Sequence, residues 1–283
     1  MNLVRPALAL LLAGFALFPG ATRAAESYDS CAGFIDSLPV VISSQGTWCL
    51  RKDLSTAVAT GFAIKIAANN VTIDCNHFKL GGLAAGDGSK TYGVYAENRQ
   101  NVTVRHCNLR GFYAGVFLWR GAGHLVEDNR VDNSLGYGIF MLTDFSTSGM
   151  IRNNQVYATG GAPDHVTIPG ISAVADIIDN TVDGVFSATA NGAPIGIDAM
   201  GPGTEVRGNR VRGLVSGGSG TAIGLRMMAD GIVATGNRFI SQTPLVGGKA
   251  IHGSNYGVCQ DNIASRYQFL MTSCQDGGGN VIN

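Results

Sequence analysis

Most of the chain consists of short runs, three to five residues long, in which every second residue is apolar. Runs of this length and period are typical of β-strands, whereas a helix needs apolar residues at intervals of three and four over a longer stretch. Beyond the first 25 or so residues, no stretch of ten residues has that helical period. The pattern predicts an all-β chain of many short strands joined by turns.

Two short sequence motifs, which we call the Asn phrase and the Gly phrase, alternate along the chain and contain these runs. In the first, an apolar run is followed by Asn, one further residue and another apolar residue, as in IRNNQV (151–156) and IIDNTV (177–182). In the second, Gly precedes apolar residues at alternating positions, and this Gly recurs at 93, 115, 138, 170, 196 and 224. Repeats of short strands predict coils that stack to bury their inner faces. Stacking about 4.8 Å apart should then form one amide ladder, with the members Asn129, Asn154, Asn180, Asn209 and Asn237.

A β-propeller or a β-sandwich would need longer antiparallel strands and a regular series of hairpin turns, which the sequence lacks. The two phrases resemble the repeats of the pectate-lyase-like superfamily. The stretch from Cys31 through SLPVVISSQGTWCLRKDL and AIKIAANNVTIDCNHFKLGG resembles the entry segment of exported bacterial β-helix proteins. This resemblance implies a single right-handed parallel β-helix, a solenoid of about eight coils. It does not specify an activity, because the fold hosts lyases, hydrolases, esterases, epimerases and non-enzymes.

Residues 1–25 have the composition of a signal peptide, with Arg5, an apolar stretch over 7–18 and small residues around an expected cleavage site near Ala24 or Ala25. The apolar stretch is too short to cross a bilayer stably. We therefore expect a secreted or periplasmic protein with no stable membrane insertion. The expected organisation is an N-terminal entry or cap segment over 26–62 and a parallel β-helix domain over 63–283.

Composition narrows the partners. The 20 Lys and Arg residues balance the 20 Asp and Glu residues, so nothing favours nucleic acid as a partner. The 40 glycines indicate many tight turns. The sequence specifies no oligomeric state.

Six cysteines in an exported chain favour disulfides. Because the terminal coils of a stack fray, we expect a disulfide that stabilises each end, Cys31–Cys49 at one and Cys259–Cys274 at the other. Cys75 and Cys107 lie one repeat apart and are expected to form a third, diagonal bridge. A zinc site is disfavoured, since there is no CxxC pair and the five histidines are scattered.

The residue that follows each inward-facing apolar residue of the Gly phrase should face outward. On this rule Tyr95, Phe117, Trp119 and Phe140 form an aromatic surface over three coils, which we interpret as a substrate-binding surface for sugar rings. The alternative is that loops cover these rings, or that the rings stack on one another and stabilise the sheet.

The same rule places Asp198, Arg226 and His252 on successive coils, pointing into solvent. A carboxylate, a guanidinium and an imidazole are the groups needed to neutralise a uronate carboxylate and to move its α-proton, so these three are the candidate catalytic residues. The alternative is a surface salt-bridge ladder of little energetic weight. No cofactor is expected; the turn residues Asp144 and Asp176 leave a Ca²⁺ site open as an alternative.

Two functions remain open from the sequence. The protein either binds or processes an acidic polysaccharide along its strands, by β-elimination or epimerisation, or it is a non-catalytic surface or periplasmic scaffold. The aromatic residues and the Asp–Arg–His series favour the first. The absence of the family's catalytic signatures and the zero net charge favour the second.

Overall fold

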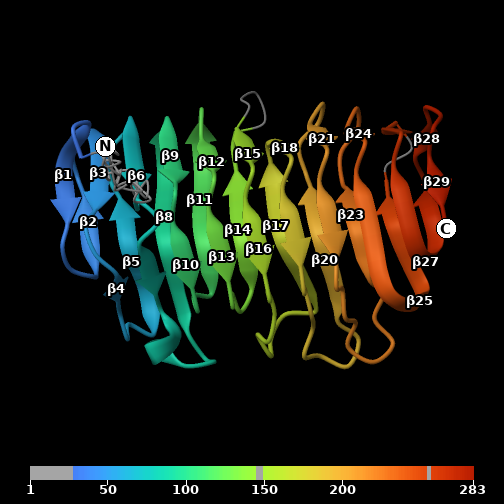
Figure 1. The fold of residues 1–283 in the computed structure, drawn as a ribbon, viewed down its shortest axis with the longest axis horizontal. Helices are drawn as coiled ribbons and strands as arrows, with labels where there is room; N and C mark the ends of the chain where they lie inside the picture. The colour runs from blue at the N-terminus through green and yellow to red at the C-terminus, as the bar shows by residue number, and fades with distance from the viewer. Residues whose placement is uncertain (1–27, 145–148, 254–255) are drawn as a thin grey trace, which may run out of the picture.

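The computed structural model describes residues 28–144, 149–253 and 256–283. The expected signal peptide, residues 1–25, lies outside the described residues. From Cys31 onward the chain winds into a right-handed parallel β-solenoid of about nine turns, close to the predicted eight coils. Successive turns follow one another along the long axis from the N-terminal to the C-terminal end (Figure 1).

Three columns of parallel strands run along the solenoid, and we name them faces 1, 2 and 3 in the order in which a turn passes through them. Face 1 contains β2 (Val40–Ile42), β5 (Thr60–Ile66), β8 (Lys90–Gln100), β11 (Ala114–Ala122), β14 (Tyr137–Leu142), β17 (Thr167–Val174), β20 (Ala193–Ala199), β23 (Ile223–Met227) and the C-terminal parts of β25 (Arg238–His252) and β27 (Ile263–Thr272).

Face 2 contains β1 (Cys31–Ile35), β3 (Gly46–Leu50), β6 (Val71–Asp74), β9 (Val102–Arg105), β12 (Leu125–Glu127), β15 (Met150–Arg152), β18 (Asp176–Ile178), β21 (Glu205–Arg207), β24 (Val233–Thr235), β26 (Val258–Gln260) and β28 (Gln275–Asp276). Face 3 contains β4 (Leu54–Ser55), β7 (Lys79–Gly81), β10 (Asn108–Arg110), β13 (Arg130–Asp132), β16 (Gln155–Tyr157), β19 (Thr181–Asp183), β22 (Arg210–Arg212), the N-terminal parts of β25 and β27, and β29 (Val281–Ile282). One 3₁₀ turn, η1 (Leu83–Ala85), precedes β8.

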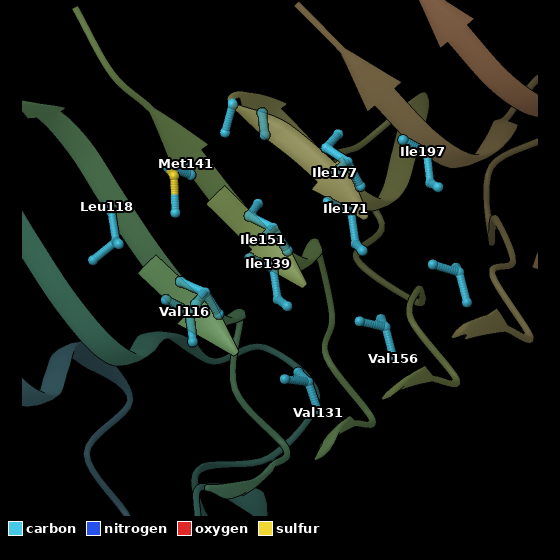
Figure 2. Packing of buried hydrophobic residues seen from close by; sticks show 14 of the residues in the cluster. Val116, Leu118, Val131, Ile139, Met141, Ile151, Val156, Ile171, Ile177 and Ile197 are labelled. Atoms are coloured by element: carbon cyan, nitrogen blue, oxygen red, sulfur yellow. The ribbon is translucent and has the colours of Figure 1, made fainter. Parts of the chain in front are cut away.

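The core is a set of aliphatic columns inside the solenoid. Val94, Val116, Ile139, Ile171 and Ile197, the predicted inward residues of face 1, are all fully buried. Val116, Ile139, Ile171 and Ile197 come from successive turns and point into the same interior (Figure 2). Each turn contributes equivalent residues to these columns. A single turn could not bury its apolar side chains by itself, so their burial depends on the stacking of the turns.

The predicted amide ladder is confirmed and lies at the corner between faces 2 and 3. Asn129 donates from Nδ2 to Oδ1 of Asn154 at 3.0 Å, and Asn154 donates in the same way to Asn180 at 3.0 Å. The series continues through Asn209 and Asn237 to two further members, Asn262 and Asn280. Each of these asparagines also satisfies backbone groups of the adjoining turns, which explains why the position is occupied by amides.

The three predicted disulfides are present. Cys31–Cys49 and Cys259–Cys274 join turns near the two ends, with Cα–Cα distances of 5.9 and 6.2 Å. Cys75–Cys107 is the predicted diagonal bridge, with a Cα–Cα distance of 4.7 Å. The Cys107 amide donates to Oδ1 of Asn129, so this cysteine occupies the first position of the ladder.

Among the residues that the structure describes, no helix combines the length and the apolar character needed for a membrane span.

Candidate functional site

The outward column that the Gly phrase predicts on face 1 is in register throughout. Tyr95 pairs with Phe117, Phe117 with Phe140, and Phe140 with Ser172. The pairing continues from Ser172 to Asp198, Arg226 and His252. The predicted aromatic and polar candidates therefore occupy one line along the solenoid, with the aromatic residues in the earlier turns and the charged residues in the later turns.

The aromatic residues form a single cluster in which rings stack on one another. The rings of Phe117 and Phe140 have centroids 4.5 Å apart and are 12° from parallel. Trp119 lies 6.1 Å from Phe117 at 7°, and Tyr95 lies 6.0 Å from Phe117 at 15°. Part of the aromatic column thus stabilises the sheet itself, which was the alternative interpretation of these residues.

Three further tyrosines belong to this cluster, and one of them, Tyr113, lies edge to face with Tyr92 at 5.9 Å and with Tyr137 at 6.1 Å. Tyr92 lies 4.5 Å from Phe117, and Tyr137 contacts Phe140 edge to face at 5.3 Å. Both stand directly before the Gly of the repeated phrase, and the alternation rule counted only the residues after it. The position before that Gly also faces outward, which is the signal that could have identified them.

Exposure differs within the cluster. Tyr95, Phe117 and Trp119 are half-buried, so each leaves part of its ring accessible. Phe140 is only 8% exposed, and the prediction that it contributes to an open surface is wrong, because neighbouring rings cover it. The Tyr95 hydroxyl donates to Glu97 at 2.8 Å; burial, that hydrogen bond and the adjacent negative charge together raise the pKa of Tyr95 to about 12.

Asp198 and Arg226 form a bidentate ion pair between adjacent turns. Nε of Arg226 donates to Oδ1 of Asp198, and Nη2 donates to Oδ2, both at 2.8 Å. The hydroxyl of Ser172, one turn earlier, lies 3.4 Å from Oδ2. The hydrogen bond to Asp198 raises the pKa of Arg226 above its ordinary value, in spite of the opposing effect of burial.

The prediction that Asp198 points into solvent is wrong. Asp198 is 4% exposed, and its side chain is covered by the guanidinium that it binds and by the neighbouring turns. Arg226 and His252 are half-buried. This is consequently a buried pair of the kind whose separation is costly, not a solvent-screened surface pair.

His252 follows Arg226 in the column but forms a different contact. Its Nδ1 lies 2.8 Å from the hydroxyl of Thr272, on the next turn. Burial, followed by the positive charges of Lys249 and Arg226, lowers the pKa of His252 below its ordinary value. The lowered pKa favours the neutral form of the imidazole, which can accept a proton.

A long loop before β17 is tied down beside the aromatic cluster. Asp164 forms an ion pair with Lys90 at 2.7 Å, and Nε2 of His165 is hydrogen-bonded to the Tyr113 hydroxyl. The Lys90 ammonium also lies 4.8 Å from the centroid of the Tyr113 ring. These contacts connect the loop to turns that are far from it in sequence, near the N-terminal ends of the face 1 strands.

A cleft of about 420 Å³ lies where the chain passes from face 3 to face 1. None of the predicted site residues lines it. Its lining consists of Leu83, Gly86, Asp87, Gly111, Asn133, Leu135, Ala158, Gly160, Gly161 and Phe186.

Of the candidate calcium residues, Asp144 lies beyond the end of β14, and Asp176 is the first residue of β18, so the prediction that Asp176 lies at a turn is wrong. Oδ1 of Asp176 accepts a hydrogen bond from the backbone amide of Glu205 at 2.9 Å, which joins β18 to β21 on the next turn. Within the described ranges, no group of three or more His, Cys, Asp or Glu side chains is arranged to hold a metal ion.

Residues 52–211 match the family model described as "Right handed beta helix region". The chain belongs to this family. The match covers the turns from β4 into β22, including the aromatic cluster and the ladder members from Asn129 to Asn209.

Solved structures that are similar to this chain include two that cover most of its length. One is the Dettilon tailspike protein (gp208), at 14% identity and a TM-score of 0.32, over 79% of this chain and 58% of that one. The other is the A-module of the mannuronan C-5 epimerase AlgE6 of Azotobacter vinelandii, at 13% identity and a TM-score of 0.28, over 84% of this chain and 83% of that one. This chain thus spans less than two thirds of the tailspike chain. A comparison with curated protein sequences finds no significant match.

Proposed function

We propose that this protein is exported and binds a polysaccharide along face 1, with the half-exposed rings of Tyr95, Phe117 and Trp119 as its contact surface. The observation that carries the proposal is the register of these rings. One polymer lying along the solenoid axis would meet an apolar ring at each of two successive turns, with the Glu97 carboxylate beside them. Disulfides of this number fit an oxidising compartment, where extracellular glycans occur.

The arrangement favours binding over acid–base chemistry at Asp198. Both oxygens of this carboxylate accept hydrogen bonds from Arg226, and the side chain is buried. A general base must reach the proton that it removes. We therefore assign the Asp198–Arg226 pair a positioning role, in which it fixes two adjacent turns beside the aromatic surface.

One observation keeps catalysis as a second candidate. His252 lies next to Arg226 in the column, and its lowered pKa favours the neutral imidazole. A neutral imidazole beside a guanidinium is suited to removing the α-proton of an acidic sugar, as β-elimination and epimerisation require. Under this candidate function, His252 is the base and Arg226 binds the sugar carboxylate.

The test is a panel of neutral and acidic polysaccharides in affinity electrophoresis, with ultraviolet detection of unsaturated uronate products. We expect Trp119→Ala to weaken binding about tenfold, because stacking on one ring contributes on the order of 1 kcal/mol or more. The matched control is Tyr256→Ala, which removes a ring that is 69% exposed and lies outside face 1.

If Trp119→Ala bound with unchanged affinity, or if the protein bound no member of the panel, the glycan-binding proposal would be replaced by the scaffold hypothesis. Formation of unsaturated products that disappears in His252→Gln would establish the catalytic candidate.

A further inference from the structure

Face 3 carries a second outward row, separate from the proposed glycan surface. The first outward residues of its strands pair in register from turn to turn: Lys79, Asn108, Arg130, Gln155, Thr181, Arg210 and Arg238. The row contains cationic, amide and hydroxyl side chains and no carboxylate. Its last two polar members, Arg210 and Arg238, are direct neighbours on adjacent turns, and the register then continues with Ile263 and Val281.

Arg210 and Arg238 are exposed, and in the part of the chain that the structure describes neither guanidinium has a hydrogen bond or an ion pair. Neighbouring arginines differ in this respect. Arg212 is held by Asp183 at 2.8 Å, and Arg207 by Glu205 at 2.8 Å. Like charges placed directly opposite each other on parallel strands are unfavourable, unless an anion lies between them.

The corner of the solenoid beside these two arginines also differs from the other turns. The residue before each ladder asparagine has a positive φ, and on flanking turns it is an acid, as at Asp179 (φ 55°) and Asp261 (φ 54°). Beside Arg210 and Arg238 it is Gly208 (φ 68°) and Gly236 (φ 65°). A Cβ placed on Gly236 would meet no atom within 4 Å. At Gly208 a Cβ would collide with Oδ1 of Asp179, so that carboxylate borders the corner on the Arg210 side, and the corner is open beside Arg238.

Arg130 provides an internal comparison at the same row position. Its corner residue is Asp128, its Nε lies 3.4 Å from Asp132, and its guanidinium lies 4.6 Å from the centroid of the Tyr157 ring. There the protein supplies the partners of the arginine. At Arg210 and Arg238 it supplies none.

We propose that Arg210 and Arg238 together bind a sulfate or phosphate group, either as the free ion or as an ester on a polymer. Adjacent turns fix the two guanidinium groups about 4.8 Å apart at their Cα atoms, and planar guanidinium groups bind tetrahedral oxyanions through paired N–H donors. The site is independent of face 1, so the protein can hold an anionic group on one face and the proposed glycan on another.

The experiment is calorimetric titration of the full chain with sodium sulfate and with sodium phosphate, at constant ionic strength set by sodium chloride. We expect saturable binding, a loss of about tenfold in affinity in Arg238→Gln, and no binding in the double variant Arg210→Gln/Arg238→Gln. Arg120→Gln, which removes an exposed arginine away from face 3, serves as the matched control and should bind as the wild type does.

A second arm compares dextran sulfate with unsubstituted dextran. Tighter binding of dextran sulfate than of free sulfate, lost in the double variant, assigns the site to a polymer-borne ester; equal affinity per sulfate assigns it to the free ion. Trp119→Ala should leave both titrations unchanged, which separates this site from the glycan surface.

The proposal is overturned if the wild type and the double variant respond equally to sulfate and phosphate, since that response would be a general salt effect. It is also overturned if the double variant melts several degrees lower in chloride alone. Removing an unneutralised pair of like charges should leave the melting temperature unchanged or raise it.

Discussion

The amide ladder and the outward column of face 1 have the same geometry but different chemistry. Each contributes one residue per turn, in register, over most of the solenoid. In the ladder every member after Cys107 is Asn, and the amides accept hydrogen bonds from the preceding turn and donate to the next. In the column the residues change from aromatic to hydroxyl, acid, arginine and imidazole. Where the same residue recurs, every turn needs the hydrogen bonds that this residue makes. Where the residue varies, its contacts depend on the neighbouring side chains of that turn.

Removing Arg226 tests whether the varied column is also structural. Arg226→Ala should lower the free energy of unfolding by about 2–4 kcal/mol, because it leaves the buried Asp198 carboxylate without its partner. A solvent-screened pair would lose less than about 1 kcal/mol. Urea denaturation followed by circular dichroism measures the difference.

The control for this prediction is the double variant Asp198→Asn/Arg226→Gln, which removes both charges and retains two polar side chains. It should be more stable than Arg226→Ala, since no buried charge is left unpaired. A single variant as stable as the wild type would show that this part of the column has no structural role.

Breaking the ladder should have a somewhat smaller effect. Asn180→Ala is expected to destabilise the protein by about 1–3 kcal/mol, because the backbone amide of Asn154 and the carbonyls of Ile151 and Ile178 lose this side chain as a partner in the interior. Gln260→Ala, at an exposed amide, should change the stability by less than about 0.5 kcal/mol. If the two variants proved equally stable under urea, the ladder would have no special energetic role.

The smallest effect concerns the pH dependence of the column. The pKa of His252 in the folded state lies below its ordinary value of about 6.5, which applies to the unfolded chain. At a pH between the folded-state pKa and about 6.5, the unfolded chain therefore binds more protons than the folded chain. The contribution of His252 is present above pH 6.5 and is lost as the pH falls through this window. Wild type should lose stability relative to His252→Gln between pH 7.5 and pH 5.5, in parallel denaturation series. An imidazole signal of His252 that titrates at or above pH 6.5 in NMR would contradict the expected direction.

Much of the architecture could be predicted from the sequence because stacking repeats a single local pattern. The period-2 runs gave the strands, the recurring Asn gave the ladder, and the Gly phrase gave the register of Tyr95, Phe117, Asp198 and Arg226. The spacing of one repeat predicted Cys75–Cys107, since residues one turn apart in sequence are adjacent in space, and the position of the other four cysteines near the ends of the stack predicted Cys31–Cys49 and Cys259–Cys274.

Only the tertiary structure decided what covers an outward-facing residue. Alternation distinguishes the inside of the solenoid from its outside, but it does not specify which neighbouring side chains or loops lie over a given position. It therefore did not reveal that Arg226 encloses Asp198, that Phe140 lies beneath its neighbouring rings, or that His165 and Asp164 reach back to Tyr113 and Lys90. The unpaired state of Arg210 and Arg238 was hidden for the same reason. It depends on which side chains meet across adjacent turns, and those meetings are fixed only when the turns have stacked.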